Sequence, residues 1–408
     1  MRTLICIAGL FLSASIHLMA CTTAIISGKG TPDGRPLLFK QRDTGSLQNK
    51  LMSFSDGKYE YIGIVNTSDT LGLEVWGGYN STGFAIMNSA SYNLNPPSNK
   101  NREEREGIVM KKALQACATL ADFEKLLDTL PRPLLVSANF GVIDAQGGAA
   151  YYETGDDHYV KYDVNDSKIA PSGYLIRTNF SYSGDRTRDM GLSRYQQATV
   201  LFYQAALCSG LTPEFLLKDV ARCLTHGLTG TNLRENLPTT AEQPAFVPFR
   251  DYIIRYSTAS AIAVQGVKKG EALEMTTMWT LLGSPLTTVA IPVWLNPRHI
   301  YPSIMLADSK EKAQLCDWSL SLKNRLFPIQ YGEGSDYLNW AALLSADGKG
   351  ILQKLAPLEE LLWKKSSELL SEWRQQGKRP EKLKEYAQWV DQTVSEYYYQ
   401  VMQVTTAK

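Results

Sequence analysis

The chain changes character abruptly at Cys21. An apolar run, Leu4–Leu18, follows Arg2 and leads to Ala20 just before this cysteine. Directly after it, Thr22–Ile26 has the β-branched, apolar composition of a buried strand. No flexible linker separates the two segments, so Cys21 must stand where the apolar run meets the first strand of the fold.

Residues 1–20 are predicted to be an export signal. Arg2 supplies the positive start, and the apolar run is too short to span a bilayer comfortably. Cleavage after Ala20 would give a mature chain that begins with Cys21 and carries a thiol and a free α-amine on one residue. We therefore expect an exported protein, either periplasmic or extracellular.

A lipid anchor is the alternative role for this cysteine. Leu18-Met19-Ala20-Cys21 also fits a lipobox, in which Cys21 is acylated and holds a lipoprotein at the membrane. A lipoprotein cysteine is normally followed by a polar, flexible tether. The immediate strand favours the unanchored interpretation. The alternative is a lipid-anchored surface binding protein without catalytic activity.

The composition is that of an ordinary globular protein. The 408 residues include 44% hydrophobic and 20% charged residues, and the formal net charge is +1. This balance gives no electrostatic reason to expect nucleic acid as a partner. No later stretch is as long and apolar as a membrane span, so we expect stable membrane association only if Cys21 is lipidated. The expected partner is a small molecule, and a homo-oligomer remains open.

Neither the remaining cysteines nor the histidines form a metal-ligand pattern. Those of the mature chain are Cys117, Cys208, Cys223 and Cys316, and His158, His226 and His299. The cysteines lie in helix-like segments, where free buried thiols and disulfides are both open. We predict no metal and no cofactor. A hydrolase with so few histidines must take its general base from elsewhere.

Strands and helices are grouped along the chain and do not alternate. Strands are expected at residues 21–27, 36–40, 61–65, 73–76, 83–88, 136–144, 149–153, 159–162, 174–178, 260–265, 275–282 and 289–294. Helices are expected at 102–119, 121–129, 193–206, 212–223, 310–326, 355–376 and 380–404. This grouping is typical of stacked antiparallel sheets with helices on their outer faces. The predicted fold is α+β, with four αββα layers in residues 21–300 and a helical C-terminal extension, residues 301–408, packed on the same domain.

An N-terminal cysteine is a compact catalytic unit. Its α-amine has an ordinary pKa of about 7.7–8.0, so it can take the proton of the thiol without a histidine. Acyl transfer also requires a group that orients the amine and donors for the oxyanion. Asp43, which ends the segment expected to pair with the first strand, is the candidate for orienting the amine.

Several short segments carry a family resemblance. In chain order they are Cys21–Thr23, Lys40–Asp43, Gly83–Asn88, Asn139–Ala145, Thr178–Asn179, Ser193–Tyr195 and Leu282–Pro285. Their order, more than any single motif, resembles the N-terminal nucleophile (Ntn) hydrolases in the group of penicillin V acylase, conjugated bile salt hydrolase (choloylglycine hydrolase) and isopenicillin-N acyltransferase. The likeness covers roughly residues 21–300. It implies an αββα sandwich and an acylase-type hydrolase.

The resemblance also implies roles for five residues. Cys21 would be the nucleophile with its own α-amine as base, and Asp43 would bind and orient that amine. Asn88 ends the G-x-A-x-x-N strand and would donate its side-chain amide to the oxyanion. Asn179, of the T-N motif, would fix the surroundings of the nucleophile, and Arg194 is the arginine of the S-R motif.

The chain departs from this pattern at Lys40. Relatives commonly carry an arginine there, three positions before the aspartate. Arg42 directly precedes Asp43, but strand alternation places these two residues on opposite faces, so Arg42 is not expected to replace the missing arginine. Lysine lacks the planar fork of a guanidinium, which argues against bile salt specificity. The spacing of Asn179 and Arg194 fits the acyltransferase-like branch.

We predict an exported hydrolase that cleaves a linear, non-peptide amide through a thioester on Cys21. Acyl transfer to an amine, or a dipeptidase of a related cysteine family, is the alternative among enzymes. The acyl and amine parts of the substrate are not specified by the sequence. Their binding walls are expected from the loops around residues 92–100, 180–190 and 229–248.

Overall fold

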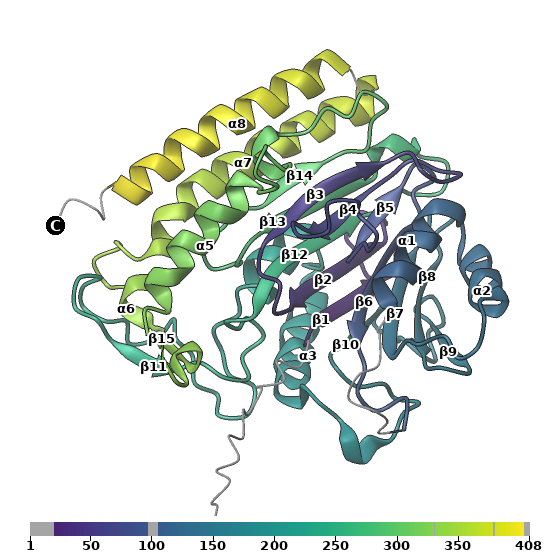
Figure 1. The fold of residues 1–408 in the computed structure, drawn as a ribbon, viewed down its shortest axis with the longest axis horizontal. Coiled ribbons are helices and arrows are strands. Elements are labelled where there is room, and N and C mark those ends of the chain that lie inside the picture. Colours follow the sequence, from purple (N-terminus) through teal and green to yellow (C-terminus); the bar gives the residue numbers. More distant parts are fainter. Residues whose placement is uncertain (1–19, 97–104, 330, 378–379, 404–408) are drawn as a thin grey trace, which may run out of the picture.

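Two antiparallel sheets are stacked face to face and covered by helices in the computed structural model of the chain (Figure 1). The structure describes residues 20–96, 105–329, 331–377 and 380–403, so the expected export signal lies outside the described residues apart from Ala20. The six-stranded sheet has the order β10-β1-β2-β12-β13-β14, and the seven-stranded sheet runs from β3 to β9 in chain order. The predicted α+β class with stacked antiparallel sheets is confirmed.

The elements have the following bounds. The six-stranded sheet contains β1 (Thr22–Ile26), β2 (Leu37–Asp43), β10 (Tyr174–Arg177), β12 (Thr258–Gln265), β13 (Thr277–Leu282) and β14 (Ile291–Val293). The seven-stranded sheet contains β3 (Asn49–Phe54), β4 (Tyr61–Asn66), β5 (Gly78–Asn80), β6 (Ala85–Ala90), β7 (Ala138–Ile143), β8 (Ala149–Thr154) and β9 (Tyr159–Asp163). A separate ribbon pairs β11 (Phe246–Pro248) with β15 (Tyr337–Asn339). The helices are α1 (Glu106–Ala116), α2 (Leu120–Thr129), α3 (Leu192–Leu207), α4 (Pro213–Phe215), α5 (Gln314–Leu326), α6 (Trp340–Leu343), α7 (Ile351–Gln376) and α8 (Pro380–Gln403). Single helical turns are η1 (Arg186–Arg188), η2 (Leu216–Val220), η3 (Leu273–Met275), η4 (Ser303–Met305) and η5 (Gly334–Asp336).

The inner faces of the two sheets meet closely at β1. Side chains of a strand alternate between its faces, so Cys21, Thr23 and Ile25 share one face. The Tyr151 hydroxyl in β8 donates to Thr23 Oγ1 across the sheets at 3.0 Å. A Cβ atom at Gly141 in β7 would lie only 2.2 Å from Met87 and 2.9 Å from Ile25. This face of β1, which includes Cys21, is therefore directed at the seven-stranded sheet.

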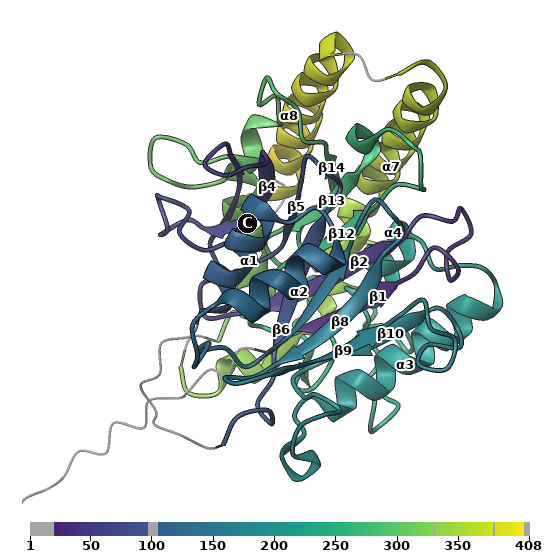
Figure 2. The same cartoon turned by 90° about the vertical axis from the view of Figure 1, so that its right-hand side faces the viewer.

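Helices cover both outer faces through aromatic contacts. On the seven-stranded sheet, Phe123 of α2 meets the ring of Tyr152 at a centroid distance of 5.1 Å. On the six-stranded sheet, Trp279 of β13 stacks on Trp363 of α7 at 3.8 Å. Figures 1 and 2 show α7 and α8 side by side along one side of the sandwich, with α1 and α2 on the other. The helices after residue 301 thus form part of one outer layer.

Two predicted elements are wrong. The expected strand at 73–76 is an irregular segment, because Gly72 and Gly77 flank it with positive φ angles of 60° and 142° and β5 begins only at Gly78. The expected helix at 212–223 is the short α4 followed by the wide turn η2, in which the amide of Ala221 donates to Leu216. The wider turn lets neighbouring apolar side chains all face the core.

Some elements differ from the prediction in their bounds or were not predicted. Helix α1 occupies Glu106–Ala116 of the expected 102–119, and residues 102–104 lie outside the described part. The predicted strands omitted β3, β5, β11 and β15, of which the last three have only three residues each. Within the described ranges the cysteines are free, and no helix there has the length and apolarity that a membrane span needs.

A buried ion pair fastens α7 to the six-stranded sheet. Arg222 donates to Glu359 at 2.7 Å and to the Thr288 carbonyl at 2.9 Å, and the Ala290 amide donates to the same carboxylate at 2.9 Å. Both charged side chains are 5% exposed. Removing either partner would leave the other charge buried and unpaired.

We predict that Glu359→Ala lowers the free energy of unfolding by about 3–5 kcal/mol, the usual cost of breaking a buried pair. The matched control is Glu360→Ala, because that carboxylate pairs with Lys218 while 68% exposed and should contribute less than about 1 kcal/mol. Urea unfolding measures both. Equal losses would show that α7 is not held by the buried pair.

Candidate functional site

Cys21 lies directly before β1, which pairs with β10 and β2 in the six-stranded sheet. Its side chain is 4% exposed, and Ala20 is 6% exposed. The cysteine borders a void of about 10 Å³ that is also lined by Lys40, Arg42, Trp76, Asn88, Ala90 and Glu106. Such a void holds about one water-sized group. The nucleophile predicted from the sequence therefore faces a closed space between the two sheets.

Arg194 holds the backbone of Cys21. Its Nη1 donates to the Cys21 carbonyl at 2.7 Å, and its Nη2 donates to Asn179 Oδ1 at 2.6 Å. The residue stands in the first turn of α3, which begins after Gly191 at a φ of 79°. A Cβ atom at Gly191 would lie 2.2 Å from Arg194 Nη2, so glycine is required there. Burial lowers the pKa of Arg194 to about 10, a value at which it stays charged at neutral pH.

Asn179 connects the two sheets beside the cysteine. It follows the end of β10, and its Nδ2 donates to the Ala90 carbonyl at the end of β6 at 2.8 Å. Its own carbonyl accepts from the Tyr92 amide at 3.1 Å. With Arg194 bound to its oxygen, the Asn179 side chain is fixed at both ends. The T-N and S-R motifs therefore form one hydrogen-bonded chain that reaches Cys21.

Asp43 lies beside the peptide bond that precedes Cys21. Its Oδ1 accepts from Thr258 Oγ1 at 2.6 Å, and its Oδ2 accepts from Arg255 Nη2 at 2.6 Å and from Arg255 Nε at 3.0 Å. The same Nη2 donates to the Ala20 carbonyl at 3.1 Å. Before cleavage, Asp43 is thus linked to the Ala20–Cys21 peptide through Arg255.

Arg255 is a site residue that the sequence reasoning missed. It lies before β12, and its partner Asp43 is 212 positions away in the chain. The two meet because β12 pairs with β2, with Thr258 opposite Asp43 and a register irregularity before Ser260. An arginine before a strand carries no motif, so only the strand pairing reveals it.

Lys40 and Asn88 meet across the sheets. Lys40 Nζ donates to Asn88 Oδ1 at 2.6 Å. Burial lowers the pKa of Lys40 to about 7, while the negative groups of Cys21 and Glu106 favour its charged form and Arg42 disfavours it. The residue at the departure from the family pattern is therefore a buried lysine that titrates near neutrality.

Arg42 lies on the same face of β2 as Lys40, opposite to Asp43, as strand alternation requires. Its Nη1 donates to Asn49 Oδ1 at 2.6 Å, and its guanidinium carbon lies 4.6 Å from the centre of the Trp76 ring. Burial lowers its pKa to about 10. One strand thus presents two cations to the Cys21 void and one carboxylate to the other side.

The structure brings all five predicted residues to the Ala20–Cys21 junction, in different ways. Arg194 reaches it by a direct hydrogen bond, Asn179 through Arg194, Asp43 through Arg255, and Asn88 through the shared void. In the uncleaved chain the hydrogen-bond partners of Asp43 are Arg255 and Thr258.

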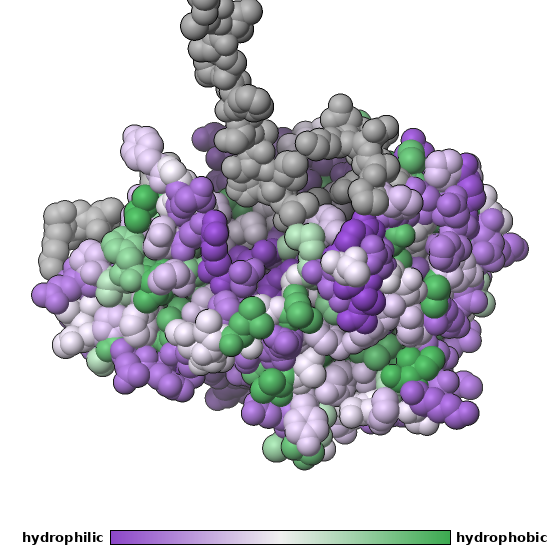
Figure 3. All heavy atoms as spheres, turned by 90° about the horizontal axis from the view of Figure 1, so that it is seen from below, coloured by the Kyte–Doolittle hydropathy of each residue, from purple (hydrophilic) through white to green (hydrophobic). Residues whose placement is uncertain are grey.

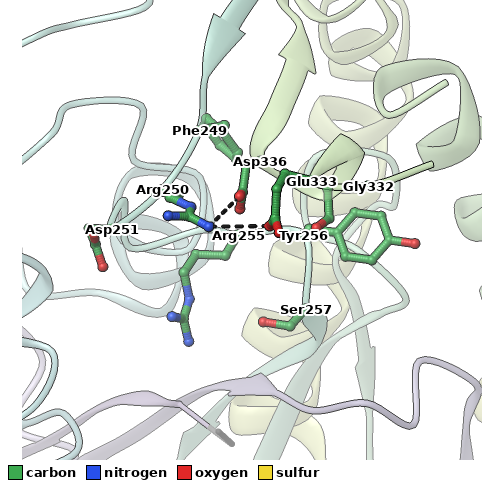
Figure 4. A pocket seen from close by; sticks show the side chains of 10 residues that line it. Phe249, Arg250, Asp251, Arg255, Tyr256, Ser257, Gly332, Glu333 and Asp336 are labelled. Carbon is green, nitrogen blue, oxygen red and sulfur yellow. Dashed lines mark hydrogen bonds and ion pairs between the residues drawn. The ribbon is translucent and has the colours of Figure 1, made fainter. Parts of the chain in front are cut away.

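Two larger cavities adjoin this junction. The first, of about 280 Å³, is lined by Ala20, Thr44, Tyr92, Asn179, Met190, Gly191, Arg194, Asp251, Arg255 and Ser257. The second, of about 530 Å³, shares Asp251, Arg255 and Ser257 with it, and Arg250 lies there between Glu333 and Asp336 (Figure 4). Tyr92 and Met190 belong to two of the three predicted wall loops, whereas residues 229–248 line neither cavity.

The surface at this end of the molecule mixes polar and apolar side chains (Figure 3). Across the described ranges, no three His, Cys, Asp or Glu side chains are grouped to hold a metal ion. The chemistry available at the junction is therefore that of a thiol, carboxylates, amides and buried cations.

Solved structures with a similar fold have been compared with the chain. Penicillin V acylase from Agrobacterium tumefaciens aligns with 69% of this chain and 87% of its own, at 13% identity and a TM-score of 0.37. An N-acylethanolamine-hydrolyzing acid amidase ortholog from Caenorhabditis elegans aligns over 47% and 86%, at 15% identity and a TM-score of 0.34. A variant of the conjugated bile acid hydrolase from Clostridium perfringens aligns over 69% and 93%, at 11% identity and a TM-score of 0.34.

Neither a protein-family model nor a curated protein sequence matches the chain. Penicillin V acylase and the bile acid hydrolase belong to the groups that the sequence motifs resemble.

We predict that the stability difference between the wild type and Lys40→Met changes with pH. The pKa of Lys40 is about 7 in the fold and about 10.4 in an unfolded chain. Between these values the unfolded chain binds the proton and the folded chain does not, so stability contributed by this residue rises with pH. One proton is worth about 1.4 kcal/mol per pH unit.

The free energy of unfolding is measured with urea at about pH 7 and pH 9. Between these two pH values, the difference between the wild type and Lys40→Met should shift by roughly 2 kcal/mol in favour of the wild type. Lys50→Met is the control, because Lys50 is 3% exposed but ion-paired with Glu311 at 2.9 Å. A difference that is flat across this range would refute a neutral Lys40 in the fold.

Proposed function

We propose that the mature chain, starting at Cys21, is an exported hydrolase of a linear, non-peptide amide, with Cys21 as the nucleophile. The observation that supports this most is the convergence of charged groups on the two peptide groups that flank Cys21. Arg255 donates to the Ala20 carbonyl and Arg194 donates to the Cys21 carbonyl, with Asp43 behind Arg255. A strand start with only a structural role would not need two guanidinium groups, one of them buried and the other with its side chain 22% exposed, because their desolvation is costly.

Cleavage after Ala20 would convert this arrangement into a reacting centre. The new α-amine would lie beside Asp43, which would orient it, and it would accept the proton of the Cys21 thiol. The sulfur then attacks the amide carbonyl, and the Asn88 amide with a backbone N–H stabilises the oxyanion. The protonated amine gives its proton to the leaving nitrogen, and water attacks the resulting thioester to release the acid.

The geometry favours this nucleophile over a lipid anchor. An acylated Cys21 would have to direct its sulfur towards a membrane. In the structure the side chain is 4% exposed and borders a void with Lys40, Trp76 and Asn88. A lipid chain would not fit there unless the sheets separated. Acyl transfer to an amine remains a second enzymatic candidate, because the same thioester would serve both reactions.

We predict that the purified mature protein hydrolyses at least one amide in a panel of penicillin V, glycine- and taurine-conjugated bile acids, N-acyl amino acids and dipeptides. Cys21→Ala should abolish turnover, because no other group supplies the thioester. Cys208→Ala is the control, since Cys208 is an exposed free cysteine and should retain the wild-type rate. Product release is measured by chromatography, with and without a primary amine that reveals acyl transfer.

Intact mass determination tests the premise of a free N-terminus. We expect the mass of a chain that begins at Cys21 without modification. A mass that includes acyl chains on Cys21, or unchanged turnover in Cys21→Ala, would overturn the proposal.

A further inference from the structure

We propose that Arg42 is a further catalytic residue, which donates from its guanidinium to the oxyanion formed when Cys21 attacks a carbonyl, and that Lys40 positions the Asn88 amide beside it. The inference rests on the proposed function, since it concerns the same nucleophile. The sequence predicts only that Arg42, which lies opposite to Asp43, does not replace the missing arginine, and it assigns Arg42 no role of its own.

The hydrogen bonding of Arg42 is incomplete. The residue is 2% exposed, and its one side-chain hydrogen bond in the described residues runs from Nη1 to the neutral amide oxygen of Asn49. Its Nε and Nη2 are buried and have no hydrogen-bond partner within those residues, and no described carboxylate forms an ion pair with it. A buried cation with free donors is costly unless an anion binds there during function.

The position of the guanidinium is fixed. Trp76 lies against it at 4.6 Å, and Asn49 holds Nη1. Burial disfavours the charged form of Arg42, whereas the negative charges of Cys21 and Glu74 favour it. Arg42 in turn disfavours the charged form of its neighbour Lys40. Arg42 also lines the void that it shares with Cys21, and we infer that its two free donors, Nε and Nη2, serve that void.

The void has the size for an oxyanion. About 10 Å³ accommodates one oxygen atom. When the sulfur lone pair forms the C–S bond, the π electrons of the carbonyl move to its oxygen, and the thiol proton passes to the α-amine. Arg42 donates a hydrogen bond to that oxygen without losing a proton. A charge-assisted donor is roughly twice as strong as a neutral one, so Arg42 would add to what Asn88 supplies.

Lys40 has a different task. Its Nζ donates a hydrogen bond to Asn88 Oδ1 at 2.6 Å, and this bond determines the orientation of the amide. The Nδ2 of Asn88 is then the end that is free to donate to substrate. Lys40 thus acts on the oxyanion through Asn88, as a positioning residue.

Two reactions of the mature protein separate an oxyanion donor from a group that merely stabilises the sulfur. Acylation of Cys21 by p-nitrophenyl acetate forms a tetrahedral oxyanion, whereas alkylation by iodoacetamide needs the thiolate but forms no oxyanion. Peptide mass analysis of the segment that begins at Cys21 resolves both from reaction at other cysteines. Neither measurement requires that an amide substrate be known.

We predict that Arg42→Met slows acylation by about 10²–10³, the usual effect of losing one oxyanion donor, while alkylation changes less than about threefold. Arg42→Lys should recover part of the acylation rate. Arg42→Met should remain folded with an unchanged melting temperature, since it removes an incompletely paired buried charge. Arg35→Met, at an arginine paired with Asp33 and Glu271 away from the void, is the control and should leave both rates unchanged.

Lys40→Met should reduce acylation less than Arg42→Met does, and Lys40→Arg should restore it. If Arg42→Met lost acylation and alkylation in parallel, its effect would lie on the sulfur, and the oxyanion role would be overturned. An Arg42→Met variant that is acylated at the wild-type rate would overturn that role as well. If the wild type is acylated normally but hydrolyses no amide, the proposed function is refuted, whereas the role of Arg42 as an oxyanion donor still holds. A Cys21 inert to both reagents would refute both proposals.

Discussion

The buried guanidinium of Arg194 is the interaction on which the arrangement around Cys21 depends. A buried cation must have acceptors, and Arg194 finds them in the Cys21 carbonyl and in Asn179 Oδ1. Asn179 in turn donates to Ala90 in the other sheet. Helix α3, the start of β1 and the ends of β6 and β10 are therefore tied to one side chain. Loss of that group would leave several buried acceptors unsatisfied at once.

The second constraint is the alternation of β2. Lys40 and Arg42 face the void between the sheets, whereas Asp43 faces Arg255. The strand lies between β1 and β12 in the sheet, so it supplies charged groups to both sides of the Ala20–Cys21 junction. The positive groups are directed at the sulfur side, and the carboxylate is directed at the side where the α-amine would form. This separation of charge follows from the two-residue period of a strand.

The sequence predicted what depends on local patterns and missed what depends on distant pairing. The αββα layers follow from grouped, periodic segments. Cys21, Asp43, Asn88, Asn179 and Arg194 are candidates because each lies in a short segment that resembles a family motif. Arg255 lies in no motif, and its role depends on the register of β12 against β2. The expected strand at 73–76 and the expected helix at 212–223 failed because glycine positions and core packing overrode local preference. The alternation of side chains along β2 could not by itself indicate the proposed role of Arg42 as an oxyanion donor. That role depends on the position of its guanidinium, which Trp76 and Asn49 from other segments determine.

Removal of the residues before Cys21 would change the electrostatics of the junction as well as its covalent structure. In the uncleaved chain Arg255 Nη2 has the Ala20 carbonyl as an acceptor, and cleavage takes that acceptor away. The new α-amine would then lie near two arginines, the buried Arg194 and the partly exposed Arg255, with Asp43 as the neighbouring carboxylate. Like charges disfavour a further cation, so this surrounding favours the neutral amine over the ammonium. The neutral amine is the form that accepts a proton from the thiol, and the same arginines that hold the peptide before cleavage would therefore keep the amine ready to act as a base afterwards.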